Sequence, residues 1–146
     1  SLGGKLLVTA SWTDQRFDNA IGQLRSHQVH MDCTRGDLAK LKEILLTRRG
    51  FLLRLLENQN LLEHETFTDL LWAVFHLAEE LDFRKEVGSL AHPDCEHIAG
   101  DIKRAYVILI VEWLAYMKHL KKEYPYLFSL AVRTNPFDPG ASVEVR

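Results

Sequence analysis

The chain has 146 residues and a formal net charge of −2, and its composition is 47% hydrophobic and 26% charged. A chain of this size and composition is expected to fold around a hydrophobic core, which excludes intrinsic disorder outside its ends. The near-neutral charge argues against a dedicated nucleic-acid-binding protein, because such proteins are normally basic. We find no pattern of a secretory signal peptide or a transmembrane helix in this stretch, and we expect a cytoplasmic location.

The cysteines agree with that location. Cys33 and Cys95 lie far apart and form no C-x-x-C pair. This pattern fits a reducing cytosol better than a disulfide scaffold. The chain does not begin with Met, and we interpret Ser1-Leu2 as an expression remnant and Gly3 as the first native residue of a domain cut from a longer protein.

The N-terminal third is expected to form an arm followed by two helices. Residues 5–10 (KLLVTA) lack helical spacing and suit a linker or a packed arm. Thr13-Asp14 can cap a first helix that runs to about Met31. A break at residues 33–37 (CTRGD) then precedes a second helix that runs to about Glu57.

One apolar pattern crosses this break, with a residue at every seventh position: Phe17, Leu24, Met31, Leu38, Leu45 and Leu52. A long dimerising coiled coil would need a second apolar position in each heptad as well. That second position is mostly charged, with Asp14, Gln28, Arg35, Lys42 and Arg49. Two antiparallel helices of a bundle are therefore favoured over one long dimerising helix.

Three further helices are expected. Asn60 and Glu63 have the spacing of a capping box and predict a third helix that runs to about Glu86. Pro93 suits the first turn of a fourth helix, which Tyr124-Pro125 interrupts. Pro125 can open a short fifth helix, and the ending at residues 135–140 (NPFDPG) is rich in turn residues.

The centre of the fourth helix is the most apolar part of the chain. Residues 105–117 contain a single charge, Glu112, and have apolar side chains on every side of the helix. Such a helix needs neighbours on all sides, and a buried Glu112 would need a partner. We predict an all-α fold, a bundle of four main helices plus a short C-terminal helix. The domain is expected to span 1–146, with the bundle at 12–134 and arms at 1–11 and 135–146.

The start of the fourth helix has the best pattern for a metal site. The six residues 92–97 (HPDCEH) include three candidate ligands, His92, Asp94 and His97. Histidine combined with carboxylate suits a first-row transition metal. The simpler interpretation is that these histidines are solvated residues at a helix start.

Two other clusters lie on the third helix, residues 63–65 (EHE) and the set His76, Glu79 and Glu80. Di-iron carboxylate bundles require Glu-x-x-His, whereas His76 and Glu79 have the reverse order. We interpret the first cluster as acids at a helix start, and His76 with Glu80 as a helix-surface pair.

No catalytic or cofactor-binding residue is predicted. The chain has no G-x-S-x-G, no glycine-rich phosphate loop and no cysteine whose spacing implies a histidine base. We therefore expect a non-enzymatic protein without a cofactor. Four aromatic residues near the C-terminus are expected to pack subunits of a homo-oligomer: Trp113, Tyr116, Tyr126 and Phe128.

Two stretches, residues 55–81 (LLENQNLLEHETFTDLLWAVFHLAEEL) and 124–139 (YPYLFSLAVRTNPFDP), resemble the soluble C-terminal region of small prokaryotic potassium-channel-like proteins with two transmembrane helices. The TVGYG-type selectivity filter is absent from this chain. The resemblance implies a cytosolic domain that oligomerises or regulates a channel-like protein, with the membrane region of the same parent chain as a partner. The alternative is a metal-binding helical-bundle enzyme or sensor.

Overall fold

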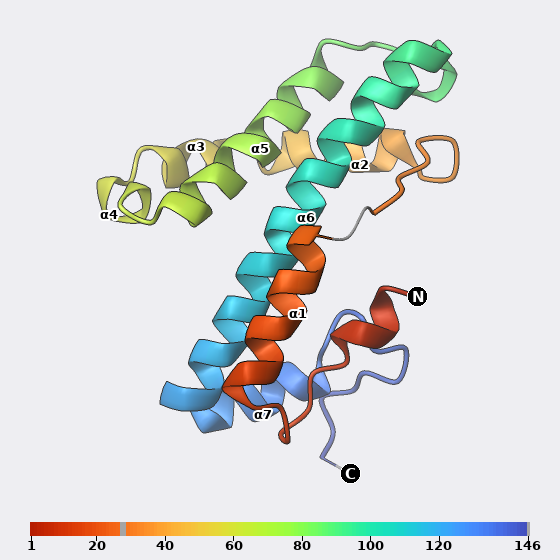
Figure 1. Cartoon of the computed structure of the whole chain (residues 1–146). Helices are drawn as coiled ribbons and strands as arrows, with labels where there is room; N and C mark the ends of the chain where they lie inside the picture. The colour runs from red at the N-terminus through yellow and green to blue at the C-terminus, as the bar shows by residue number, and fades with distance from the viewer. Residues whose placement is uncertain (27–28, 146) are drawn as a thin grey trace. The chain divides into compact units, whose positions relative to one another are not determined.

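The computed structural model describes residues 1–26 and 29–145, apart from the side chain of Leu62. These residues form helices and connecting turns, with no strand among them, so the predicted all-α class is confirmed (Figure 1). The elements are η1 (Gly3–Leu6), α1 (Asp14–Ser26), α2 (Leu38–Thr47), α3 (Arg49–Leu56), α4 (Gln59–Leu62), α5 (Glu65–Asp82), η2 (Val87–Ser89), α6 (His92–Glu123) and α7 (Pro125–Arg133).

The chain divides into two compact units. One unit contains residues 1–27 and 110–146, and the other contains residues 28–109. Helix α6 is continuous, and it contributes its first part to the unit 28–109 and its last part to the other unit. This division differs from the predicted one, in which residues 12–134 form a single bundle between two arms.

Capping residues explain several of the observed helix boundaries. The backbone N–H of Arg16 donates to Thr13 Oγ1 at 3.2 Å at the start of α1, and that of Lys40 donates to Asp37 Oδ1 at 2.9 Å at the start of α2. Such bonds satisfy backbone donors that the first turn leaves free. Pro125 lies in the first turn of α7, where its missing N–H has no cost.

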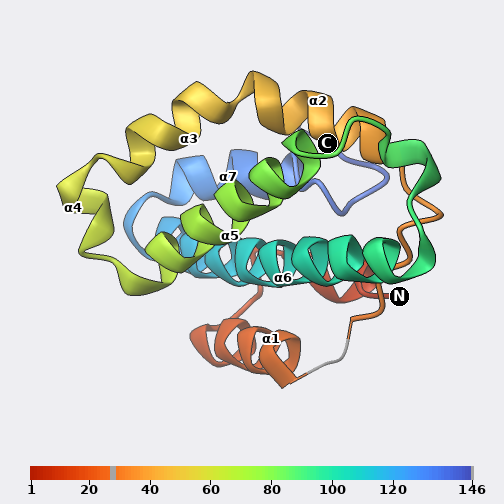
Figure 2. The ribbon, with the colours of Figure 1, turned by 90° about the horizontal axis from the view of Figure 1, so that it is seen from above.

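Several predicted boundaries are wrong. Helix α5 ends at Asp82, not near Glu86. Helix α1 ends at Ser26, not near Met31, and His27 and Gln28 lie outside the described residues. The predicted second helix is divided at Arg48 into α2 and α3, a bend that Figure 2 shows. The expected capping box does not form, because Asn58 caps α4 and α5 begins only at Glu65.

The unit 28–109 is held together by apolar residues that α2, α5 and α6 bury against one another. Leu77 and Leu81 of α5 meet Ile98 and Ala105 of α6, and Leu38 of α2 completes the layer. Figure 1 shows that the chain reverses direction between α5 and the start of α6. Residues at the edges of these two helices are therefore brought side by side.

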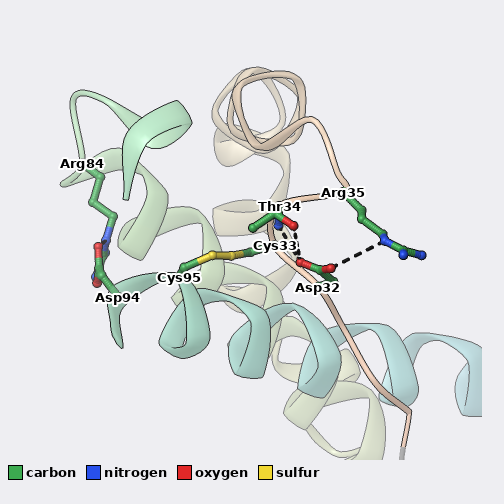
Figure 3. Close-up of a disulfide and its surroundings, with 7 residues drawn as sticks. All are labelled: Asp32, Cys33, Thr34, Arg35, Arg84, Asp94 and Cys95. Atoms are coloured by element: carbon green, nitrogen blue, oxygen red, sulfur yellow. Dashed lines mark hydrogen bonds and ion pairs between the residues drawn. A yellow bond between two sulfur atoms is a disulfide. The ribbon is translucent and has the colours of Figure 1, made fainter. Parts of the chain in front are cut away.

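A disulfide and the ion pair between Arg84 and Asp94 attach the first turn of α6 to the rest of this unit. Cys33 and Cys95 form a disulfide, with their Cα atoms 5.8 Å apart (Figure 3). The turn around Cys33 is shaped by Asp32, whose Oδ1 accepts from the backbone N–H of Thr34 at 2.9 Å. The expectation that these cysteines form no disulfide is thus contradicted, because they are 62 residues apart in the sequence and only the fold brings them together. The cytoplasmic location stays a prediction.

The other unit has its own core. Phe17 of α1 is fully buried, and its ring lies 5.1 Å from that of Trp12. Lys118 of α6 donates to Asp18 of α1 at 2.8 Å, so these helices are neighbours. The two predicted arms also pack together, since buried Asn135 donates through Nδ2 to the carbonyl of Leu6 at 2.8 Å.

The apolar centre of α6 is less enclosed than predicted. Ile110, Leu114 and Met117 are buried, but Leu109 and Tyr116 are exposed. Glu112 is half-buried and forms no ion pair among the described residues. In the parts of the chain that the structure describes, no helix combines the length and the apolar character needed to cross a membrane.

Candidate metal site

Four potential metal ligands meet at the edge of the contact between α5 and α6. They are His76 and Glu80 of α5 and His97 and Asp101 of α6, which we call the His–carboxylate cluster. Each pair is four residues apart, so both of its side chains lie on one face of its helix. One ligand atom from each residue lies within 4.8 Å of the other three. Among the described residues, no other group of three or more such side chains comes together in this way.

Nitrogen and oxygen atoms alternate around the cluster. His76 Nε2 lies 3.5 Å from Glu80 Oε1 and 3.3 Å from Asp101 Oδ2. His97 Nε2 lies 3.2 Å from the same glutamate oxygen and 3.4 Å from the same aspartate oxygen. In a tetrahedral site with bonds of about 2.0–2.1 Å, neighbouring ligand atoms are about 3.3 Å apart. Four of the six ligand separations of a tetrahedral site are thus matched, and the same N···O spacings also occur in hydrogen-bonded ion pairs.

The second oxygen of each carboxylate is occupied by an arginine. Arg84 donates through Nη1 to Glu80 Oε2 at 2.6 Å, and Arg104 donates through Nη1 to Asp101 Oδ1 at 3.1 Å. Glu80 Oε1 and Asp101 Oδ2 are thereby directed at the two imidazoles. Outer partners of this kind orient ligands in protein metal sites.

When no cation is bound, the carboxylate of Asp101 has the least favourable environment in the cluster. Its side chain is 4% exposed, and its Oδ2 atom accepts no hydrogen bond from any described residue. The two imidazole nitrogens lie at ion-pair distance from Oδ2, but they neutralise it only when they are protonated. A buried carboxylate oxygen without a donor is costly, and a bound cation removes that cost.

Arg84 also determines the protonation of two acidic residues. Its hydrogen bond, with a second one from His97, lowers the pKa of Glu80 below the usual value. Its two bonds to Asp94, at 2.7 and 2.6 Å, lower the pKa of that carboxyl as well. In turn, Asp94 and Glu80 raise the pKa of the guanidinium. Glu80 is therefore ionised at neutral pH, as a metal ligand must be.

The structure brings together only one of the three predicted metal ligands with other candidate ligands. His97 belongs to the cluster, whereas Asp94 is bound on both oxygens by Arg84 (Figure 3). His92 is exposed, and five residues before His97 it lies about 140° away around the helix. The pattern His-x-x-x-acid occurs four times in the sequence, at 76–80, 92–96, 97–101 and 119–123, so this spacing alone does not single out the two pairs that form the cluster.

The predicted interface aromatics divide into two kinds. Tyr116 and Tyr126 are exposed, whereas Phe128 is buried and the ring of Trp113 packs 5.3 Å from that of Phe137. The two exposed tyrosines are available to a partner. The expected homo-oligomer stays a prediction.

Comparisons with known proteins place the chain in a family of helical domains. It matches the family model described as "Uncharacterized protein MJ1433, C-terminal helical domain" over residues 1–133, and it belongs to that family. A relative, "Uncharacterized protein MJ1433" of Methanocaldococcus jannaschii, is 47% identical over 133 residues, which are 91% of this chain and 54% of the relative. The chain thus spans about half the length of this relative. No solved structure matches it.

The proposed resemblance to channel-like proteins is wrong. The stretches 55–81 and 124–139 lie wholly or largely within the matched residues 1–133, and neither the family nor the relative is linked to a channel. Helical periodicity and frequent leucines, which these stretches share with many helical proteins, do not distinguish one helical family from another.

Proposed function

We propose that this chain is a metal-responsive helical domain that binds one divalent transition-metal ion at the His–carboxylate cluster. The observation that favours this function most is Asp101 Oδ2, a buried oxygen without a hydrogen bond that faces two imidazole nitrogens. Two histidines and two carboxylates suit zinc, iron, cobalt or nickel better than calcium or magnesium. The imidazoles are half-exposed, so an ion can reach the cluster from solvent.

Binding is expected to join α5 to α6 through side chains from both helices. Because each helix supplies a histidine and a carboxylate, an ion at this position bridges the two elements. A ligand that binds only the folded state raises its stability in proportion to the logarithm of the ligand concentration. The ion would therefore act as a reversible clamp on the unit 28–109.

The test is a titration of chelator-treated protein with Co²⁺ and Zn²⁺, followed by visible absorption and calorimetry. We expect one ion per chain and about 2.7 kcal/mol of added stability at a free-ion concentration 100 times the Kd. His76→Ala should abolish this binding, and affinity should fall in mildly acidic buffer because imidazoles must be deprotonated to coordinate.

His92→Ala is the matched control, since it removes an exposed histidine at the start of α6 that lies outside the cluster. The control should bind metal as the wild type does. Equal metal binding by the His76→Ala variant and the wild type would contradict the proposal, as would a chain that takes up no ion.

A second candidate function is self-association through the unit 1–27 with 110–146. Exposed apolar side chains lie on the end of α6 and on α7, including Tyr116, Tyr126 and Leu130. Such exposure is typical of surfaces that pack against another protein. We expect light scattering to give a dimer or larger species, and Tyr126→Ser combined with Leu130→Ser to give a monomer. A monomeric wild type at high concentration would contradict this function.

A further inference from the structure

A pocket of about 420 Å³ adjoins the His–carboxylate cluster within the unit 28–109. It is lined by Asp69, Trp72, Ala73 and His76 of α5 and by Arg104 and Ile108 of α6. Its volume lies within the usual range for small-molecule sites, about 300–1,000 Å³. His76 belongs to both the pocket and the cluster, so a ligand in the pocket would lie beside a metal ion in the cluster.

Arg104 is the second link between the pocket and the cluster. One of its nitrogens, Nη1, donates to Asp101 Oδ1 at 3.1 Å, and its side chain is 60% exposed. The other N–H groups of this guanidinium donate to no described residue. A guanidinium has five donors in a planar fork that matches a carboxylate. The pocket therefore has an unused anion-binding group next to the proposed ion.

The rest of the wall is apolar and partly aromatic. The ring of Trp72 is exposed, and Phe75 holds it in an edge-on contact with centroids 6.1 Å apart. Ala73 and Ile108 add aliphatic surface. An exposed indole favours a flat hydrophobic group stacked on its face. Asp69 is exposed at the same pocket, and its negative charge weakens the binding of an anion there.

We propose that this pocket binds a small organic carboxylate with a flat apolar body, next to the metal ion. The proposal rests on the proposed metal binding. Arg104 binds the carboxylate, Trp72 contacts the apolar body, and the ion adds positive charge through the wall that His76 forms. The charges of the ion, Glu80 and Asp101 sum to zero, and those of Arg104 and Asp69 cancel, so the carboxylate is selected by the donors of the guanidinium rather than by a net positive charge.

Metal and carboxylate are then thermodynamically coupled. If the ion increases the affinity for the carboxylate by some factor, the carboxylate must increase the affinity for the ion by the same factor. This reciprocity provides a measurement that does not depend on any activity. A ligand in an unrelated pocket would change neither affinity.

The experiment uses benzoate as the probe on the whole chain, with benzamide as a neutral control of similar shape. Metal affinity is measured first, by Co²⁺ absorption without probe. Benzoate should then alter the Co²⁺ spectrum and the Trp72 fluorescence, assigned with Trp72→Phe, and should lower the Kd for Co²⁺. Benzamide should do neither. Loss of metal binding itself would reject the proposed function, whereas metal binding without any response to benzoate would reject only the carboxylate site.

Three variants locate the site. Arg104→Met should weaken benzoate by about 10-fold or more, the usual effect of losing a hydrogen bond to a charged group. Lys103→Met, which removes the same charge outside the pocket, should leave benzoate affinity unchanged. Asp69→Asn should strengthen benzoate binding, a gain that misfolding cannot imitate. Equal weakening by the Arg104 and Lys103 variants would overturn the proposal in favour of general charge attraction.

Discussion

Loss of the Cys33–Cys95 disulfide is expected to lower the free energy of unfolding by about 4 kcal/mol. The two cysteines are 62 residues apart. In the chain-entropy model, a cross-link that closes a loop of this length lowers the entropy of the unfolded chain and so raises its free energy by about 4 kcal/mol. For a chain of this size the loss corresponds to a fall in Tm of roughly 10–15 °C. Denaturant unfolding with and without a phosphine reductant measures the difference.

The matched control for this experiment is the double variant Cys33→Ala with Cys95→Ala. It should have the lower stability of the reduced protein, and the reductant should have no further effect on it. Both side chains are half-buried, so small apolar replacements introduce no unpaired polar group. Two titratable thiols in the untreated protein, or reduced and untreated samples that unfold at the same denaturant concentration, would contradict the prediction.

Sequence patterns located those helices whose ends are marked by local chemistry. Pro93 and Pro125 mark the start of α6 and the start of α7, and Thr13 and Asp37 cap α1 and α2. The bend at Arg48 was missed because an apolar pattern continues on both sides of it. Tertiary packing overrides local propensity at such places.

The disulfide and the cluster depend on contacts that no short segment contains. Cys33 and Cys95 meet because the turn after α1 lies against the first turn of α6. His76 and Asp101 meet because α5 and α6 reverse direction, with their shared apolar layer setting which faces touch. The sequence alone favoured ligands that were close along the chain, which selected His92 and Asp94. The sequence alone shows only that, within each helix, the histidine and the acid are four residues apart.

A loss of metal binding comparable with that of His76→Ala is expected from Asp101→Asn. Even the loss of an outer partner of a ligand typically weakens metal binding 10–100-fold, so replacement of this ligand should exceed about 100-fold. The amide that replaces the carboxylate can still accept from Arg104 through its carbonyl oxygen, while its NH₂ group can donate to an unprotonated imidazole. Calorimetric titration with Zn²⁺ measures the loss. Asp82→Asn is the control, because Asp82 lies on α5, pairs with Arg49 at 3.5 Å and is outside the cluster.

The same substitution separates a metal site from a structural ion-pair network. In the metal-free protein, Asp101 keeps a buried carboxylate oxygen that accepts no hydrogen bond from a described residue. Removing its charge should raise the metal-free stability by about 1 kcal/mol, as happens when a strained functional group is neutralised. A network that exists for stability predicts the opposite sign, because breaking it would leave partners unpaired. A less stable variant with unchanged zinc affinity would therefore identify the cluster as structural.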